Sequence, residues 1–300
     1  MTSDPMTSDP MTSDPVVPQS LPGIGGTALG VALIRALEST RPDRLFDDPY
    51  ARHFIRAADK HASPWGAGGS PAVEQFLSMM ADQVAVRTLY LDRALLDAAR
   101  QGCGQVVLVA CGMDARAYRL PWPPGTALFE LDLAHVLDFK NAVLDRLGAT
   151  ATCHRVGVAT DLRQDWLPAL AASGFDPDRP TAWLAEGILY ALSSDAAGTL
   201  LDRITIASAL GSVLALDHAE DSELLRAARA AISAELVELW QGGPVARLDG
   251  WLAARGWRPD VTDIAQAAAA CGRPTPSAFD PNRPDAGRAW LATARLGGTR

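Results

Sequence analysis

Short apolar runs recur along the chain, separated by segments in which apolar residues follow a helical period. Each run is too short for a helix and ends at turn-forming or charged residues, so we interpret the runs as buried strands. The runs are 106–109, 127–131, 155–159, 181–185, 212–217 and 289–294. Helical patterns at 136–147 and 195–210 lie between them. This alternation predicts an α/β fold with a mostly parallel sheet and helices on both faces.

Two further helical patterns precede the first strand. One covers 26–37 and ends at Arg41-Pro42. The other is an apolar-striped segment over 71–100, which is one long helix or two abutting helices. Together they predict an N-terminal helical cap over 25–100, ahead of a core over 101–300 that belongs to the same domain.

The segment after the fifth strand is also helical in pattern, over 219–240. We therefore expect an inserted helical lid at about 218–260, and a single domain from 25 to 300. The first fifteen residues repeat Met-Thr-Ser-Asp-Pro three times. This polar pentad cannot bury enough apolar surface to fold, so residues 1–24 are predicted to be a disordered tail.

The turn after the first strand carries the chemistry. It reads Ala110-Cys111-Gly112-Met113-Asp114, and Asp132 follows twenty positions after Gly112, where the second strand ends. Small residues let a ligand approach the backbone, and an acid at the next strand end can accept hydrogen bonds from both ribose hydroxyls. Asp132 can also be interpreted as a cap for the helix that follows.

Two cofactors contain such a ribose. A dinucleotide site requires G-x-G-x-x-G, whose glycines admit a pyrophosphate onto a helix N-terminus. This turn has one glycine, and Asp114 would repel phosphate but suits the cationic end of a sulfonium nucleoside. The turn therefore predicts S-adenosylmethionine, with an NAD-dependent dehydrogenase as the disfavoured alternative.

Composition excludes several other classes of protein. The formal charge of −8 and pI near 5.1 argue against a nucleic-acid-binding surface, and 48% apolar residues supply a large core. The four cysteines lack CxxC spacing and the five histidines lack metal-ligand spacing, so no metal is expected. Because no apolar stretch reaches membrane-spanning length, we expect a cytoplasmic protein without a membrane partner. The oligomeric state stays open.

Several motifs, in order, resemble one family. They are Thr27-Ala28-Leu29-Gly30-Val31, Asp48-Pro49-Tyr50-Ala51, Asp114-Ala115-Arg116-Ala117-Tyr118-Arg119-Leu120-Pro121-Trp122, Phe129-Glu130-Leu131-Asp132 and Trp183-Leu184-Ala185-Glu186-Gly187. The chain resembles the leucine carboxyl methyltransferase-like family, in its actinobacterial branch of S-adenosylmethionine-dependent methyltransferases. The resemblance implies a Rossmann-like class I methyltransferase fold with a seven-stranded sheet.

The resemblance also implies roles for individual residues. Asp132 matches the acid that binds the ribose. Asp161 and Leu162 match the pair beside the adenine, where an aspartate can accept the amino proton and a leucine can pack on the ring. Arg87 matches an arginine near the methionine carboxylate, and guanidinium offers that group a two-pronged partner. Glu186 matches an acid lining the methyl-transfer pocket.

Other features qualify these roles. Arg35 is a weaker candidate for the carboxylate, and the mid-helix position of Arg87 also suits a solvated side chain. Where the family usually has Gly-Ala-Gly, this chain has Ala110-Cys111-Gly112. The tyrosine that usually stands five residues after the glutamate is replaced by Ala191, next to Tyr190. This displacement argues against methylation of a protein C-terminus.

The predicted function is therefore O-methylation of a small-molecule acceptor. A carboxylate acceptor needs no base, whereas a hydroxyl needs a proton acceptor, for which Glu186 and Tyr190 are the candidates. The alternative is a non-catalytic S-adenosylmethionine-binding or interaction protein with a decayed acceptor pocket. Ala110 and Ala191 keep that alternative open.

Overall fold

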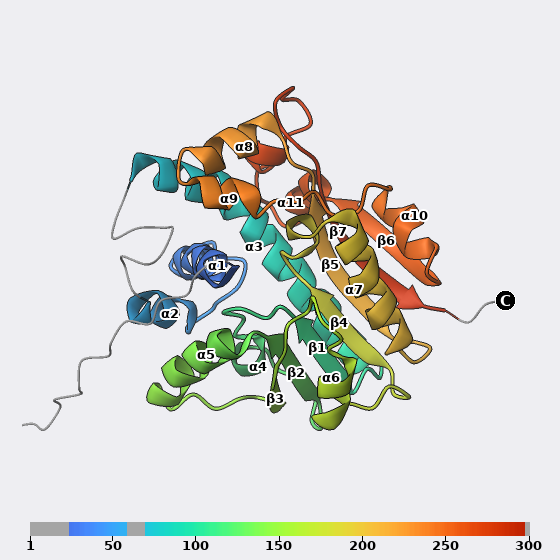
Figure 1. Ribbon diagram of the computed structural model, residues 1–300. Helices are drawn as coiled ribbons and strands as arrows, with labels where there is room; N and C mark the ends of the chain where they lie inside the picture. Colours follow the sequence, from blue (N-terminus) through green and yellow to red (C-terminus); the bar gives the residue numbers. More distant parts are fainter. Residues whose placement is uncertain (1–23, 59–69, 298–300) are drawn as a thin grey trace, which may run out of the picture.

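The computed structural model describes residues 24–58 and 70–297, and it contains a seven-stranded sheet in the order β3-β2-β1-β4-β5-β7-β6 (Figure 1). The pairs among β1 to β5 are parallel, and β7 runs antiparallel to both β5 and β6. The strands are β1 (Gln105–Val109), β2 (Ala127–Asp132), β3 (His154–Ala159), β4 (Thr181–Ala185), β5 (Val213–Ala219), β6 (Trp257–Asp263) and β7 (Ala289–Leu296). This topology confirms the predicted class I methyltransferase fold.

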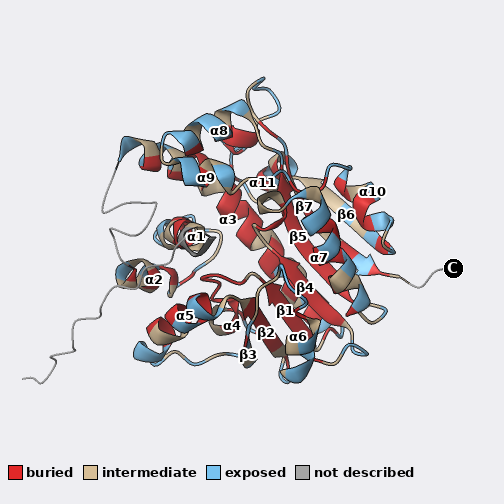
Figure 2. Ribbon diagram, viewed as in Figure 1, coloured by how far each residue is buried: buried red, intermediate tan, exposed pale blue. Residues whose placement is uncertain are grey.

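Helices cover both faces of the sheet, because its central strands are apolar on both sides. Val107 and Val109 of β1 belong to a core shared with α6 (Leu167–Ala172), α7 (Ser194–Ile206) and α10 (Leu248–Ala253). Val106 and Leu108 face the opposite way, onto α3 (Pro71–Arg100). Figure 2 shows the central strands buried between these layers.

The remaining helices are short or lie around the rim of the sheet. They are α1 (Ile24–Ser39), α2 (Ala51–Ala57), α4 (Arg116–Arg119), α5 (Ala134–Arg146), the 3-10 turn η1 (Leu189–Ala191), α8 (Glu223–Ala230), α9 (Ala234–Glu238), α11 (Ile264–Ala270) and the 3-10 turn η2 (Ser277–Phe279). None of the helices within 24–58 and 70–297 is long and apolar enough to cross a membrane.

The segment 71–100 forms one continuous helix, α3, and not two abutting ones. Ser70 caps it by accepting the Val73 N–H at 3.3 Å, and Pro71 occupies the first turn, where no backbone donor is needed. In the segment before α2, the Asp48 side chain accepts the N–H groups of Tyr50 and Ala51. Both caps follow from local sequence.

One expectation about an element was wrong, and one strand was not predicted. The segment 219–240 is not one helix, because β5 continues to Ala219 and two serines each start a new helix. Ser222 accepts the Leu225 N–H to begin α8, and Ser233 accepts the Leu236 N–H to begin α9. Strand β6 was not predicted, because its sequence Trp-Arg-Pro-Asp-Val-Thr-Asp is largely polar and contains a proline.

The predicted boundaries of the lid and of the tail can be compared with the observed elements. Both edges of the predicted lid at 218–260 fall inside strands, so the inserted segment is 220–256. Within it, α10 packs on β6, which leaves α8 and α9 as the helices near the cap. The predicted tail over 1–24 lies almost wholly outside the described residues, of which Ile24 is the first.

Candidate functional site

The carboxyl ends of the parallel strands meet at one edge of the sheet. Cys111 N–H donates to the Leu131 carbonyl at 3.1 Å, and Thr160 N–H donates to the Asp132 carbonyl at 2.8 Å. The chain winds outward in opposite directions from β1 and β4, so a topological switch point lies between these two strands. Open α/β sheets bind ligands at such a point.

The turn after β1 is held by the acid at the end of β2. Asp132 Oδ2 accepts the Gly112 N–H at 2.7 Å, and Oδ1 accepts the Leu133 N–H at 2.7 Å. Burial raises the pKa of Asp132, against the lowering effect of these two N–H groups. Helix α5 has no side-chain cap at its N-cap residue Leu133. The contacts of Asp132 therefore go to the β1 turn and its own neighbour, which weakens the interpretation as a helix cap.

Backbone conformation in this turn explains its small residues. Gly112 has φ of 47° and Ala110 has φ of 53°. A Cβ added at Gly112 would lie 2.9 Å from the Ala28 side chain of α1. The left-handed conformation favours glycine at 112, and the close approach of α1 excludes a side chain there. Ala110 adopts the same left-handed region with a side chain.

Asp161 and Leu162 come directly after β3, as predicted from the family. The Asp161 carboxylate forms an ion pair with the exposed Arg163 at 2.6 Å, and this hydrogen bond lowers its pKa. Leu162 packs against the buried core. The structure therefore brings both residues to the same edge as Asp132.

Glu186, directly after β4, is surrounded by three guanidinium groups. Its Oε1 lies 2.7 Å from Arg35 Nη2 of α1 and 3.0 Å from Arg87 Nε of α3, and its Oε2 lies 2.6 Å from Arg116 Nη1. Burial alone would raise the pKa of Glu186, but the three arginines outweigh it and hold the pKa well below its usual range. Glu186 is therefore an ionised carboxylate whose oxygens are already engaged.

Arg87 connects this cluster to β5. Its Nη1 lies 3.0 Å from Asp217 Oδ2, while Asp217 Oδ1 accepts the Gly187 N–H at 2.6 Å. The Arg87 guanidinium also hydrogen-bonds the Tyr190 hydroxyl. Arg87 is buried and ion-paired with Glu186 and Asp217, so it is not the solvated arginine that its mid-helix position allowed.

Sequence reasoning missed Arg116 and Asp217. Arg116 binds Glu186, Asp92 of α3 at 2.6 Å, and Asp114. Burial would raise the pKa of Asp114, but Arg116 outweighs it and lowers the pKa. A signal for Arg116 existed in the Asp-x-Arg motif. Asp217 was visible only as a charge at the end of an apolar run.

Three donors in this cluster have no hydrogen-bond partner. Arg35 Nε, Arg87 Nε and Arg116 Nη2 are buried without a hydrogen bond, although Arg87 Nε lies 3.0 Å from Glu186 Oε1. Native proteins rarely leave buried donors unpaired, so these atoms are available to an acceptor from a water molecule or a ligand. The described residues contain no group of three or more His, Cys, Asp or Glu side chains that would hold a metal ion.

Three tryptophans in or next to the inserted segment, Trp240, Trp251 and Trp257, separate into two groups. Trp251 and Trp257 belong to the core beneath the sheet. Trp240 instead stacks on Tyr190, with ring centroids 4.1 Å apart and planes 14° from parallel. Trp240 is therefore the tryptophan of this set that lies beside the site.

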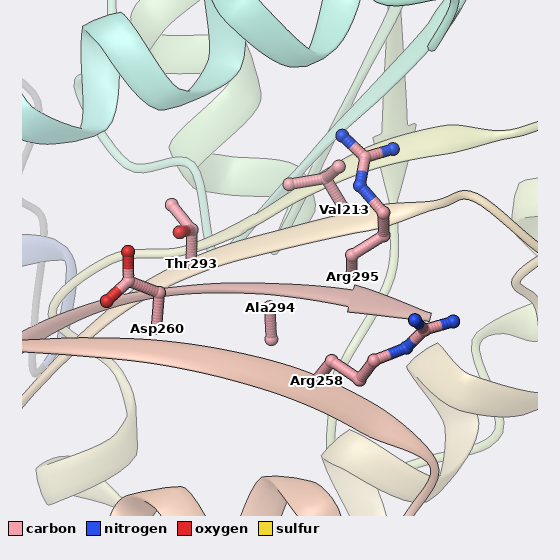
Figure 3. Close-up of a pocket in the computed structure, with 6 residues that line it drawn as sticks. All are labelled: Val213, Arg258, Asp260, Thr293, Ala294 and Arg295. Atoms are coloured by element: carbon pink, nitrogen blue, oxygen red, sulfur yellow. The ribbon is translucent and has the colours of Figure 1, made fainter. Parts of the chain in front are cut away.

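A separate depression lies at the opposite end of the sheet (Figure 3). It is lined by Val213, Arg258, Asp260, Thr293, Ala294 and Arg295. Val213 is the first residue of β5, so this depression is remote from the strand ends described above. Figure 3 shows the Arg258 and Arg295 side chains extending in different directions, so they do not form one binding group.

Comparison with known proteins identifies relatives across most of the chain. The profile of the leucine carboxyl methyltransferase family matches residues 28–205. A "Putative S-adenosyl-L-methionine-dependent methyltransferase" of Parafrankia sp. (strain EAN1pec) is 44% identical over 260 residues, which are 85% of this chain and 83% of that protein. A protein of Streptomyces avermitilis described in the same words is 42% identical over 252 residues, 84% of this chain and 89% of that protein.

The fold also resembles solved structures. A DUF574 family protein from Streptomyces avermitilis aligns with a TM-score of 0.55 and 15% identity, covering 88% of this chain and 96% of that one. A "putative methyltransferase" from Thermobifida fusca aligns with a TM-score of 0.53 and 16% identity, covering 89% and 94%. At these identities the likeness concerns the fold alone.

Proposed function

We propose, from the premise that this chain belongs to the leucine carboxyl methyltransferase family, that it methylates an oxygen atom of a small-molecule acceptor. Membership in the family makes the protein an S-adenosylmethionine-dependent methyltransferase, in agreement with the cofactor predicted from the sequence. Family membership does not specify which atom is methylated or which molecule accepts the methyl group. For both we rely on the geometry of the site.

The residues at the strand ends fit this cofactor. Its sulfonium supplies an activated methyl group when bound. We assign Asp132 to the ribose hydroxyls, Gly112 to close backbone approach, and Asp161 with Leu162 to the adenine. The assignment of the ribose rests on the placement of Asp132 against the β1 turn.

We propose that the charged cluster around Glu186 binds the amino-acid end of the cofactor. We assign its carboxylate to Arg87 together with the unpaired donors of Arg35 and Arg116. Asp114, which is ionised beside Arg116, supplies negative charge for the cationic end. This assignment explains why buried guanidinium donors are left without partners inside the chain.

The two candidate proton acceptors are poorly suited to that role. Three guanidinium groups occupy the oxygens of Glu186. Burial raises the pKa of Tyr190, against the lowering effect of Arg87, so its phenol is neutral near pH 7. We therefore propose that Glu186 orients the arginines and Tyr190 lines the acceptor side, and that catalysis comes mainly from positioning.

The observation that carries the choice of oxygen is the arginine cluster around Glu186. Three guanidinium groups from α1, α3 and the β1 turn region converge there. Glu186, Asp92, Asp114 and Asp217 offset these positive charges, so the preference comes from the unpaired N–H groups of the arginines. Such donors favour an acceptor oxygen, which accepts hydrogen bonds, over a protonated amine, which only donates them. A carboxylate acceptor also needs no base. The same intact network favours an enzyme over the alternative of a decayed pocket, despite Ala110 and Ala191.

Methyl transfer to matched acceptors tests the proposal. The purified chain is incubated with S-adenosylmethionine carrying a radiolabelled methyl group and with p-cresol, p-toluate or p-toluidine, which share one skeleton. Label is expected in the ether or ester product and absent from the amine. Transfer to p-toluidine alone would contradict the proposed chemistry. The Asp132→Ala variant is the negative control.

A further inference from the structure

A stacked row of three side chains, Arg229, Trp240 and Tyr190, leads from the inserted segment to the site; we call this row the ladder. The Arg229 guanidinium of α8 lies over the Trp240 ring, 4.4 Å from its centroid. Trp240 stacks on Tyr190 of η1, and the Tyr190 hydroxyl is hydrogen-bonded to Arg87. Arg229 is thus separated from the charged cluster by two aromatic rings.

The outer end of this ladder holds three buried donors without partners. They are Arg229 Nε, Arg229 Nη1 and Trp240 Nε1. Arg229 is 3% exposed, so water does not replace the missing acceptors at its surface. Leaving a buried donor unpaired is costly, and native proteins rarely accumulate several in one place.

The neighbouring carboxylate does not satisfy these donors. Asp221 Oδ1 lies 2.7 Å from Arg229 Nη2, and its Oδ2 lies 2.8 Å from Arg226 Nη2. Asp221 therefore covers one nitrogen of Arg229 and leaves the other two free. The missing partner must be an acceptor of hydrogen bonds, and a carboxylate matches guanidinium best because it can bind two N–H groups at once.

We propose that Arg229 and Trp240 form a subsite for a carboxylate of the methyl acceptor, and this inference rests on the proposed function. The acceptor is then an organic acid that carries a second oxygen group. Its carboxylate binds beneath α8, and the other oxygen lies toward Arg87. The edges of the stacked Tyr190 and Trp240 rings supply an apolar surface for the body of the molecule between these ends.

The backbone fixes this subsite relative to the site. The Tyr190 carbonyl accepts the N–H groups of Gln241 at 2.8 Å and Gly242 at 3.1 Å. These hydrogen bonds from the two residues after Trp240 hold the segment that follows α9 against η1. Because Arg229 is 3% exposed, the proposal requires α8 to move away from the rings before a ligand can reach the guanidinium.

The proposal is tested by isothermal titration calorimetry. The full chain is first saturated with S-adenosylhomocysteine and then titrated with 4-hydroxybenzoate. The neutral analogue 4-hydroxybenzamide has nearly the same shape and no carboxylate. We expect one site for the acid and at least tenfold weaker binding of the amide. Arg229→Gln should weaken binding of the acid at least about tenfold, because a charge-assisted pair is lost.

Two further variants separate binding from folding. Arg226→Gln is the matched control, because Arg226 pairs with the same Asp221 but its side chain is 58% exposed. It should bind the acid as the wild type does. Trp240→Phe keeps the ring and removes one donor, so it should show a smaller loss, and it decides the question if Arg229→Gln does not fold.

Three results would overturn the subsite: no binding of the acid by the wild type, equal binding of acid and amide, or unchanged binding by both Arg229→Gln and Trp240→Phe. Titration with S-adenosylmethionine distinguishes a failure of the proposed subsite from a failure of the proposed function. Retention of cofactor binding by Arg229→Gln supports a subsite distinct from the cofactor. Binding of the acid by a wild type that does not bind the cofactor would overturn the acceptor role.

Discussion

Glu186 brings three guanidinium groups into contact with one buried carboxylate. Its position after a buried strand was visible in the sequence, and so was its match to the family. Its partners were not predictable as a set, because Arg35 and Arg87 lie far away in the chain, on α1 and α3. At this scale sequence indicates which residue types carry chemistry, while the fold decides which of them meet.

Replacement of Glu186 by glutamine tests this cluster. Arg87 keeps Asp217 and Arg116 keeps Asp92, but Arg35 loses its carboxylate partner. We expect Glu186→Gln to lower the free energy of unfolding by about 3–5 kcal/mol, measured by urea denaturation, because a buried charge is left uncompensated. Asp202→Asn, which breaks the surface pair with Arg255, should cost less than about 1 kcal/mol. Equal small losses would show that the cluster does not stabilise the fold.

The elements that bear the site were largely predictable, because apolar period and turn residues act locally. Strands β1, β2 and β4 and the helix α3 follow from such patterns. Strand β6 did not, because it lies at the sheet edge and its sequence is mostly polar. The break between α8 and α9 depends on two serine caps within a segment of helical composition. Edge strands and interrupted helices depend on tertiary packing that period alone does not encode.

The β1 turn provides a prediction at the scale of an element. Gly112→Ala adds a Cβ that meets Ala28 of α1 and strains a left-handed backbone. We expect about tenfold weaker binding of S-adenosylmethionine by calorimetry, with about 1–2 kcal/mol lost from stability. Gly125→Ala is the control, because Gly125 also has positive φ but no neighbour within 4 Å. If both variants bind the cofactor equally, the close approach of α1 does not shape the site.

At the scale of the molecule, the cap and the core are joined through the site. Arg35 of α1 pairs with Glu186, Arg87 of α3 pairs with Asp217, and Asp92 of α3 pairs with Arg116. The division into a cap over 25–100 and a core over 101–300 describes order along the chain, whereas these buried pairs tie both parts together at the strand ends. The sequence predicted the cap, the core and the cofactor. It did not predict that charged residues of the cap and of the core pair with one another at the strand ends.

The most direct test of the account is calorimetric titration of the wild type and Asp132→Ala with S-adenosylmethionine. We expect one binding site per chain in the wild type. Binding should be at least tenfold weaker in the variant, because the hydrogen bonds from the ribose to a charged group are lost. Asp202→Asn should bind as the wild type does. A wild type that does not bind S-adenosylmethionine, or a variant that binds it equally well, would contradict the proposed site.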